Sequence, residues 1–453
     1  MLIRFVIENF LSFGAPAEFS VDATRELHLR ERTYAGGPDG LRLLPVAALF
    51  GPNAAGKSNL FRALQVLQRL VVEGIRPGGA IPVSPFRLDP SLRNSPTRFS
   101  IEFLAEGQVY AYEIELTSEQ VLRESLHSLK ASGKTPLFER RAAAAQPEFT
   151  FGKALAEGQA QDGQFLRFVG MGTRSNDLFL HQALDRSVAS LKPVFSWFTH
   201  TLMLLDPKTV YPALGFHMAA RHDFQAFCSD SVQRIGAGIE ALEPEVLSLQ
   251  ESQLPERLRE LALQGVTDTE GMLLGTPEGE RYSVSKVDGE LQVARVVSFH
   301  PGTDGKRVRF EFAEESDGTQ RFIDLLPALY ELGRPGNNRV VFVDELDRSL
   351  HSGLTRTVIE SYLRSWQPTQ ATQFLFTTHD ATLLDQDLFR RDEVWLLEKT
   401  QRGETQIRSL SDYQLRSDKR LMKDYLQGRF GAVPPTSRLP IRRSLVQAGP
   451  RMD

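Results

Sequence analysis

The sequence predicts an α/β fold: one core split along the chain, with an antiparallel β subdomain and a helical insertion. An apolar run at residues 43–50 precedes a segment with helical spacing, and a second apolar run at 340–343 is also followed by a helical segment. Between them, residues 98–116 alternate apolar and polar side chains, which is typical of half-buried antiparallel strands. Strand–helix units at both ends of a long middle segment indicate one divided α/β core.

The elements follow from local patterns along the chain. Alternation, apolar runs bounded by glycines, and glycine turns such as Asp288–Gly289 and Asp304–Gly305 predict strands and hairpins. Apolar residues at helical spacing predict the helices. Strands are expected at 2–10, 18–21, 43–50, 98–116 and onward to 151, 281–312, 340–343 and 373–377. Helices are expected from residue 57 to about 70, at 176–203, 221–263, 318–332 and 353–366.

Four segments follow from this reading. Residues 1–175 form a core lobe with the β subdomain, and 176–280 form a mainly helical insertion. Residues 281–431 complete the core, and 432–453, which are rich in proline and arginine, form a flexible tail.

Composition places the chain among soluble globular proteins. Of 453 residues, 41% are hydrophobic and 24% charged, which excludes a disordered, collagen-like or membrane-embedded chain. No apolar run approaches the ~18 residues of a spanning helix. The net charge of −4 provides no overall attraction to DNA or anionic lipid.

The expected compartment is the cytoplasm, without a membrane partner. The first ten residues are strand-like and contain Glu8, unlike a signal peptide. Cys228 is the only cysteine, so internal disulfides and cysteine metal clusters are excluded, as is usual in a reducing compartment.

Residues 51–58 match the phosphate-loop pattern G-x-x-x-x-G-K-[ST]. Glycines let backbone N–H groups approach phosphate oxygens at a helix N-terminus, where the helix dipole also favours an anion. Lys57 is expected to reach the β- and γ-phosphates of ATP, and the Ser58 hydroxyl to ligate Mg²⁺. A glycine-rich turn that only caps a helix is the alternative, but the strand before and the amphipathic helix after it favour a phosphate loop. The predicted nucleotide-binding residues are Gly51, Pro52, Asn53, Ala54, Ala55, Gly56, Lys57, Ser58 and Asn59.

An acidic pair, Asp344 and Glu345, directly follows the apolar run at 340–343. Ligands of open α/β sheets bind at that edge, so Asp344 is suited to hold Mg²⁺ and Glu345 to polarise the attacking water as a general base. His379 ends the next apolar run and could donate a hydrogen bond to the γ-phosphate. Taken alone, these residues would fit an acidic surface turn and a structural histidine; beside a phosphate loop they predict a catalytic site.

Residues 315–320, Glu-Ser-Asp-Gly-Thr-Gln, precede a predicted helix, and Ser316 is a good N-cap. Read in isolation, capping alone explains this segment as well as an anion site does.

Together these elements resemble the head of ABC-type ATPases. The phosphate loop, a signature loop at 316–320, the acidic strand end, a D-loop-like run at 346–351 and a switch histidine at His379 occur in that order. The signature reads SDGTQ where SGGQ is common. No residue is assigned to the glutamine loop, because Gln65 and Gln68 lie within the first predicted helix.

In ABC ATPases the signature serine and glycine contact the γ-phosphate bound by the partner subunit. The resemblance therefore implies a homodimer or larger homo-oligomer built around shared ATP sites. It implies catalytic roles for Lys57, Glu345 and His379. It also adds nucleotide contacts from Ser316, Gly318, Gln320 and Asp347.

A narrower resemblance concerns bacterial defence. The long separation of phosphate loop and signature is shared with SMC-type heads and OLD-like ATPases, but the middle segment lacks the sustained heptads of an SMC arm. Residues 7–13 (IENFLSF), 344–351 (DELDRSLH) and 428–431 (GRFG) are similar to stand-alone ATPases of AbiL and PARIS-type abortive-infection systems. The chain after His379 is expected to be too short for the C-terminal nuclease domain of OLD enzymes.

The resemblance implies a Mg²⁺-dependent ATPase that acts as sensor and switch of an anti-phage system. Its implied partners are further copies of the chain, a separate effector or nuclease, and a phage trigger protein. The first alternative is an SMC-like DNA repair or recombination ATPase that binds DNA directly through a local basic groove. A transporter energy subunit and a non-hydrolysing nucleotide-regulated scaffold are further alternatives.

Overall fold

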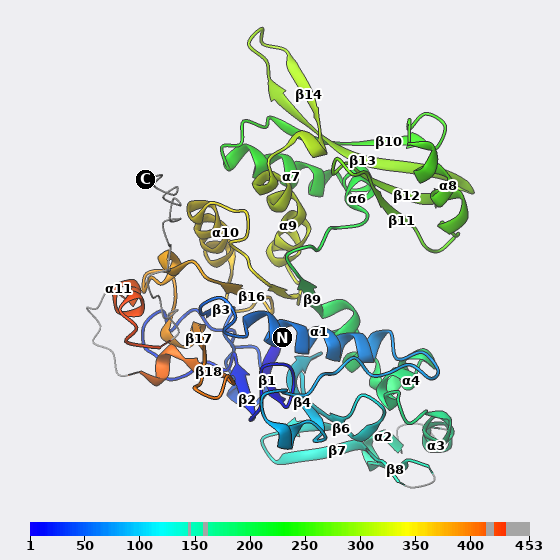
Figure 1. Cartoon of the computed structure of the whole chain (residues 1–453), viewed down its shortest axis with the longest axis vertical. Coiled ribbons are helices and arrows are strands. Elements are labelled where there is room, and N and C mark those ends of the chain that lie inside the picture. Colours follow the sequence, from blue (N-terminus) through cyan, green and yellow to red (C-terminus); the bar gives the residue numbers. More distant parts are fainter. Residues whose placement is uncertain (144–145, 157–161, 414–420, 432–453) are drawn as a thin grey trace, which may run out of the picture.

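A computed structural model describes residues 1–143, 146–156, 162–413 and 421–431 (Figure 1). The predicted tail at 432–453 lies outside these residues. The chain forms a six-stranded, mostly parallel core sheet, a seven-stranded antiparallel sheet and a distal antiparallel sheet. The fold is therefore α/β with an antiparallel β subdomain, as the sequence predicts.

The core sheet brings together strands from both halves of the chain. Its spatial order is β18 (Thr405–Ser409), β17 (Val394–Lys399), β3 (Val46–Phe50), β16 (Gln373–Thr378), β15 (Val340–Val343) and β9 (Leu202–Leu205). Only β18 runs antiparallel to its neighbour. Every residue of β3, β15 and β16 is buried, which explains the continuous apolar runs.

Strand β3 separates the two largest hydrophobic clusters. Ala47 and Leu49 belong to the cluster that contains the apolar face of α1 (Lys57–Val72). Val46, Ala48 and Phe50 belong to the other cluster, which contains residues of α9 (Asp317–Gly333) and α10 (Ser352–Ser365). The sheet is covered on both faces, and the phosphate loop emerges from its centre.

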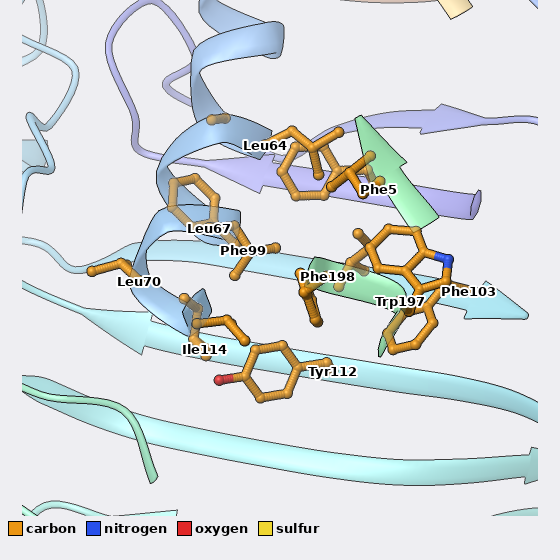
Figure 2. Packing of buried hydrophobic residues seen from close by; sticks show 14 of the residues in the cluster. Phe5, Leu64, Leu67, Leu70, Phe99, Phe103, Tyr112, Ile114, Trp197 and Phe198 are labelled. Atoms are coloured by element: carbon orange, nitrogen blue, oxygen red, sulfur yellow. The ribbon is translucent and has the colours of Figure 1, made fainter. Parts of the chain in front are cut away.

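The β subdomain packs against α1 (Figure 2). Aromatic residues fill this contact: the Phe103 ring stacks on Trp197 with 4.4 Å between ring centroids, and Phe198 packs edge-on against Phe103. Its strands, in spatial order, are β2 (Ala17–Ser20), β1 (Leu2–Glu8), β4 (Thr97–Ala105), β5 (Gln108–Leu116), β6 (Val121–Lys130), β7 (Gly133–Arg141) and β8 (Glu148–Phe151). The predicted hairpin at 98–116 and the extension of the sheet to residue 151 are confirmed.

The distal sheet lies at the opposite end of the molecule (Figure 1). Its strands are β10 (Ala241–Ser248), β13 (Glu290–Pro301), β12 (Arg281–Val287) and β11 (Met272–Gly275), and β14 (Arg307–Glu311) also pairs with β13. Both predicted hairpin turns occur here, between β12 and β13 and between β13 and β14.

The segment 176–280 differs from the predicted helical insertion. It contains helices, but β9 joins the core sheet beside β15, and β10 and β11 pair with the later strands β13 and β12. The prediction that 221–263 is mainly helical is wrong for β10, because its backbone pairs with β13 in an antiparallel ladder. The remaining helices are α2 (Lys153–Ala156), α3 (Asp162–Gly172), α4 (Phe179–Asp185), α5 (Lys192–Ser196), α6 (Leu214–Ala220), α7 (His222–Arg234), α8 (Glu256–Gly265) and α11 (Leu421–Leu426).

Within the described part of the chain, no helix has both the length and the apolar character needed to cross a bilayer.

Candidate nucleotide site

The phosphate loop connects β3 to α1, and its glycines are required by its surroundings. A Cβ on Gly51 would lie 2.5 Å from the Leu397 carbonyl oxygen, and one on Gly56 would collide with Thr405. Gly56 is the N-cap of α1 at φ 111°, and it has no side chain to bond the first turn. The N–H groups of that turn therefore suit an anion.

The Lys57 side chain folds back over the start of the phosphate loop. Its Nζ donates to the carbonyl oxygens of Gly51 (2.6 Å) and Pro52 (3.2 Å), and the residue is only 7% exposed. Burial lowers the pKa of the ammonium, while the charges of Asp347, Asp344 and Glu345 act in the opposite direction. Among the described residues no carboxylate forms an ion pair with Lys57, and a cation held only by loop carbonyls is suited to receive phosphate oxygens.

The loop is braced from the N-terminal segment and β18. The Thr405 hydroxyl lies 2.8 Å from both the Ala55 carbonyl oxygen and the Ser12 hydroxyl. Asn59, predicted to bind nucleotide, instead donates from Nδ2 to the Ser12 oxygen at 2.7 Å. Sequence reasoning missed Ser12 and Thr405, because nothing in the local pattern brings them to the loop.

The acidic pair lies at the carboxyl end of β15, one strand beyond β16. Asp344 is buried, and its Oδ1 accepts a hydrogen bond of 2.6 Å from the Thr377 hydroxyl. The same hydroxyl accepts from the backbone N–H of Glu345 at 2.7 Å. Glu345 has a left-handed backbone at φ 52°, and Arg348 Nη1 lies 3.7 Å from its Oε2. Thr377 thus positions both acidic residues.

His379 follows β16, which pairs with β3 on one side and β15 on the other. Its placement one strand from Asp344 is as predicted. The side chain is 54% exposed, and Nδ1 lies 3.2 Å from Oδ2 of the buried Asp347. Among the described residues, Asp347 Oδ1 has no hydrogen-bond partner.

The signature-like segment begins α9. Ser316 is the N-cap and accepts a hydrogen bond from the Thr319 N–H at 3.2 Å, while Gln320 Nε2 donates to the Glu315 carbonyl at 2.9 Å. A Cβ on Gly318 would lie 2.7 Å from the Ser349 carbonyl oxygen. Over the described ranges, no hydrogen bond joins Ser316, Gly318 or Gln320 to the phosphate loop. Gly318 lies against Ser349 of the 346–351 run instead.

Asp206 is a further acidic residue at this edge that the sequence analysis missed. Leu205 pairs with Val343 in parallel register, so Asp206 and Asp344 follow neighbouring strands at the same level. The Asp344 N–H donates to the Leu205 carbonyl at 2.9 Å. The signal was a carboxylate directly after a short apolar run, the same pattern that identified Asp344.

The donor set fits Mg²⁺ bound together with a nucleotide. In the part of the chain that the structure describes, no group of three histidine, cysteine or acidic residues could hold a metal ion alone. Mg²⁺ commonly uses one or two protein oxygens together with substrate phosphates and water. Ser58, at the start of α1, and Asp344, at the end of β15, could supply those oxygens.

The comparison with protein families identifies the core. A family model described as "AAA domain, putative AbiEii toxin, Type IV TA system" matches residues 46–385, well over half of the chain. The chain belongs to this family. The match includes the phosphate loop, the signature-like segment, the acidic pair and His379. This AbiEii-type AAA chain has a P-loop ATPase core, and its family implies ATP binding.

The comparison with solved structures finds an SMC head domain and a recombination mediator protein. The SMC head domain from Thermotoga maritima is 12% identical, with a TM-score of 0.38, and the match covers 91% of this chain and 99% of that one. The recombination mediator protein RecF, solved with ATPrS, is 13% identical, with a TM-score of 0.31 and coverage of 90% and 98%. No curated protein sequence matches this AbiEii-type AAA chain.

Proposed function

We propose that the chain is a Mg²⁺-dependent ATPase whose ATP-bound dimer controls a separate effector in bacterial anti-phage defence. The observation that carries the ATPase proposal is the order β3–β16–β15 in the core sheet. This order sets the phosphate loop, His379 and the Asp344–Glu345 pair along one sheet edge. The family's printed description refers to a toxin–antitoxin system, and it supports the defence context together with the AbiL and PARIS-like motifs.

In the proposed reaction, a water oxygen attacks the γ-phosphorus of ATP, the bond to the bridging oxygen breaks, and ADP leaves. Lys57 and the loop amides bind the phosphates, and Glu345 takes the proton of the water. Mg²⁺ at Ser58 and Asp344 would neutralise charge on the phosphate oxygens. His379, oriented by Asp347, would donate to the γ-phosphate.

Dimerisation would supply the remaining contacts. Glu345 and His379 are partly exposed and face solvent at the sheet edge. Covering this edge with the partner subunit's α9 would bring Ser316 and Gly318 to the γ-phosphate and exclude water. The ATP-bound dimer would then bind or release an effector or nuclease, in response to a phage trigger protein.

The test compares wild type with Glu345→Gln by phosphate release and by light-scattering mass, each with and without Mg-ATP. We expect the variant to bind ATP, to lose about 10²–10⁴-fold in turnover, as for removal of a general base, and to accumulate as a dimer. Unchanged hydrolysis would refute the role of Glu345. A monomer under every condition would refute the shared ATP site.

A second candidate follows from the word toxin in the family description: the chain itself would be the growth-arresting component. Expression of this chain alone in a bacterial host distinguishes the two. Growth arrest that requires Lys57 would favour the toxin assignment, whereas normal growth until a neighbouring gene is co-expressed would favour the switch.

A further inference from the structure

Arg321 in α9 is a buried cation without a dedicated partner. The residue is 6% exposed, and its Nε and Nη2 atoms have no hydrogen-bond partner among the described residues. Within the same residues it forms no ion pair. A buried guanidinium is normally paired and fully hydrogen-bonded, because its desolvation is costly. The position of Arg321 therefore requires an explanation beyond packing.

Carboxylates of α9 and of the acidic sheet edge act electrostatically on this guanidinium. Burial lowers the pKa of Arg321, the charges of Asp324, Asp206 and Asp344 offset part of that effect, and Arg348 opposes them. All three carboxylates have other close partners. Asp344 Oδ1 accepts from Thr377 at 2.6 Å, and Asp324 Oδ1 lies 2.6 Å from Arg281 Nη1. Asp206 accepts from a backbone N–H at 2.7 Å and has no ion-pair partner among the described residues.

The same helix is tied to the distal sheet one turn further along. Arg281 is the first residue of β12, and its guanidinium also lies over the Phe312 ring, 4.5 Å from the centroid. Asp324 joins this residue to α9. Helix α9 lies between the core sheet and the distal sheet (Figure 1), so these charges lie between the nucleotide site and the distal sheet.

We propose that Arg321 is a positioning residue that transmits the state of the Mg-ATP site to α9 and, through Asp324 and Arg281, to the distal sheet. The inference rests on the proposed function. A metal ion at Asp344 would cancel the attraction of that carboxylate for Arg321. Asp324 is held by Arg281, so Asp206 would then be the nearby carboxylate without an ion-pair partner among the described residues, and Arg321 would move toward it. Ser316 caps the start of α9, and Gly318 lies in its first turn. Movement of α9 would therefore reposition both predicted trans contacts, and it would also move β12.

Hydrogen exchange measured by mass spectrometry tests this coupling in the full chain. Exchange of residues 281–301 is compared with and without Mg²⁺ and a non-hydrolysable ATP analogue, and the affinity for the analogue is measured separately. In wild type we expect a nucleotide-dependent change in these residues. Arg321→Gln should bind the analogue within about threefold of wild type, since it is not a nucleotide contact, but should lose the distal change. Arg321→Lys should restore part of it.

Matched variants separate coupling from stability. Asp206→Asn and Arg281→Gln should lose the distal change. Lys286 is on the same strand as Arg281 and forms an exposed ion pair with Asp268. Lys286→Gln removes that pair and should keep the distal change. If Arg321→Gln does not fold, Asp206→Asn and Arg281→Gln decide, and a full response in either overturns the proposal. A full response in folded Arg321→Gln, or wild type that binds nucleotide without any distal change, also overturns it. Wild type that fails to bind the analogue would refute the proposed function instead.

Discussion

The Thr377 hydroxyl donates a 2.6 Å hydrogen bond to Oδ1 of Asp344 and so ties the end of β16 to the end of β15. The same oxygen accepts the N–H of Glu345 at 2.7 Å. One side chain, fully buried between the phosphate-loop strand and the acidic strand, therefore fixes the carboxylate expected to hold Mg²⁺ and the backbone of the expected base. This arrangement depends on the parallel register in which Phe376 pairs with Val343.

Thr377→Val should keep the shape of this side chain and remove both hydrogen bonds. Leaving a buried carboxylate oxygen and an N–H unpaired should lower the free energy of unfolding by about 1–3 kcal/mol. It should lower kcat more than it raises KM, because the disturbed groups are expected to act on the attacking water. Urea unfolding and phosphate-release kinetics measure the two effects.

Thr372→Val is the matched control. Thr372 is also fully buried and lies directly before β16, where its hydroxyl is 3.3 Å from the Tyr362 hydroxyl, at the opposite end of the strand from the acidic pair. The Thr372→Val variant should have a lower free energy of unfolding but an unchanged kcat. Equal kcat for Thr377→Val and Thr372→Val would contradict a positioning role for Thr377.

Lys57→Ala should weaken ATP binding. The Nζ atom lies among loop carbonyls and forms no ion pair within the described ranges, so phosphate oxygens would be its strongest partners. A charge-assisted hydrogen bond contributes about 1.5–3 kcal/mol, which corresponds to roughly a ten- to hundredfold loss of affinity. Titration with a fluorescent ATP analogue measures it. Arg62→Ala, exposed on the same helix, should bind normally, and equal binding by Lys57→Ala would refute the phosphate-loop assignment.

Gly318→Ala tests the predicted contact in trans. The added Cβ would lie 2.7 Å from the Ser349 carbonyl, so the start of α9 or the 346–351 run must shift. We expect nucleotide binding within about threefold of wild type and loss of the ATP-dependent dimer, both followed by titration and light scattering. Gly333→Ala, at the end of the same helix with nothing within 4 Å of its Cβ, should dimerise as wild type does. A dimer of normal stability in Gly318→Ala would show that the signature assignment is wrong.

The sequence was sufficient for the central strands and the phosphate loop. Runs such as 46–50 and 340–343 are apolar on both faces because helices cover both sides of the sheet, and each is followed by a segment with helical spacing. The sequence pattern was not sufficient to predict β9 as a strand. Leu202–Leu205 directly follows the helical turn Trp197–Thr201, and four apolar residues fit a helix as well as a strand.

Contacts between distant segments were the other limit. Ser12 and Thr405 brace the phosphate loop from opposite ends of the chain, and only the folded arrangement brings them together. Asn59 follows the phosphate loop directly and was therefore predicted to bind nucleotide, but its side chain bonds Ser12. A motif predicts which backbone cradles a ligand more reliably than where each neighbouring side chain points.

Arg32→Ala should destabilise the chain in a pH-dependent way. Glu393 is buried, and Arg32 Nε donates to its Oε1 at 3.2 Å. Burial raises the pKa of Glu393 to about 7, although Arg32 acts to lower it. Because this folded-state value exceeds the unfolded one, ionisation of Glu393 costs folding free energy, and its contribution to stability declines as pH rises toward and through 7. Without Arg32 the ionised carboxylate would be unpaired, and its pKa would rise further.

We therefore expect Arg32→Ala to lose about 3–5 kcal/mol at pH 8, as when one partner of a buried ion pair is removed. The loss should be clearly smaller at pH 5.5, where Glu393 binds a proton. Urea unfolding at both pH values measures the difference. Arg364→Ala, which breaks the exposed pair with Glu360, should change stability by less than about 1 kcal/mol at either pH. An equal loss for Arg32→Ala at both pH values would mean that lost packing, and not the charge of Glu393, dominates its effect.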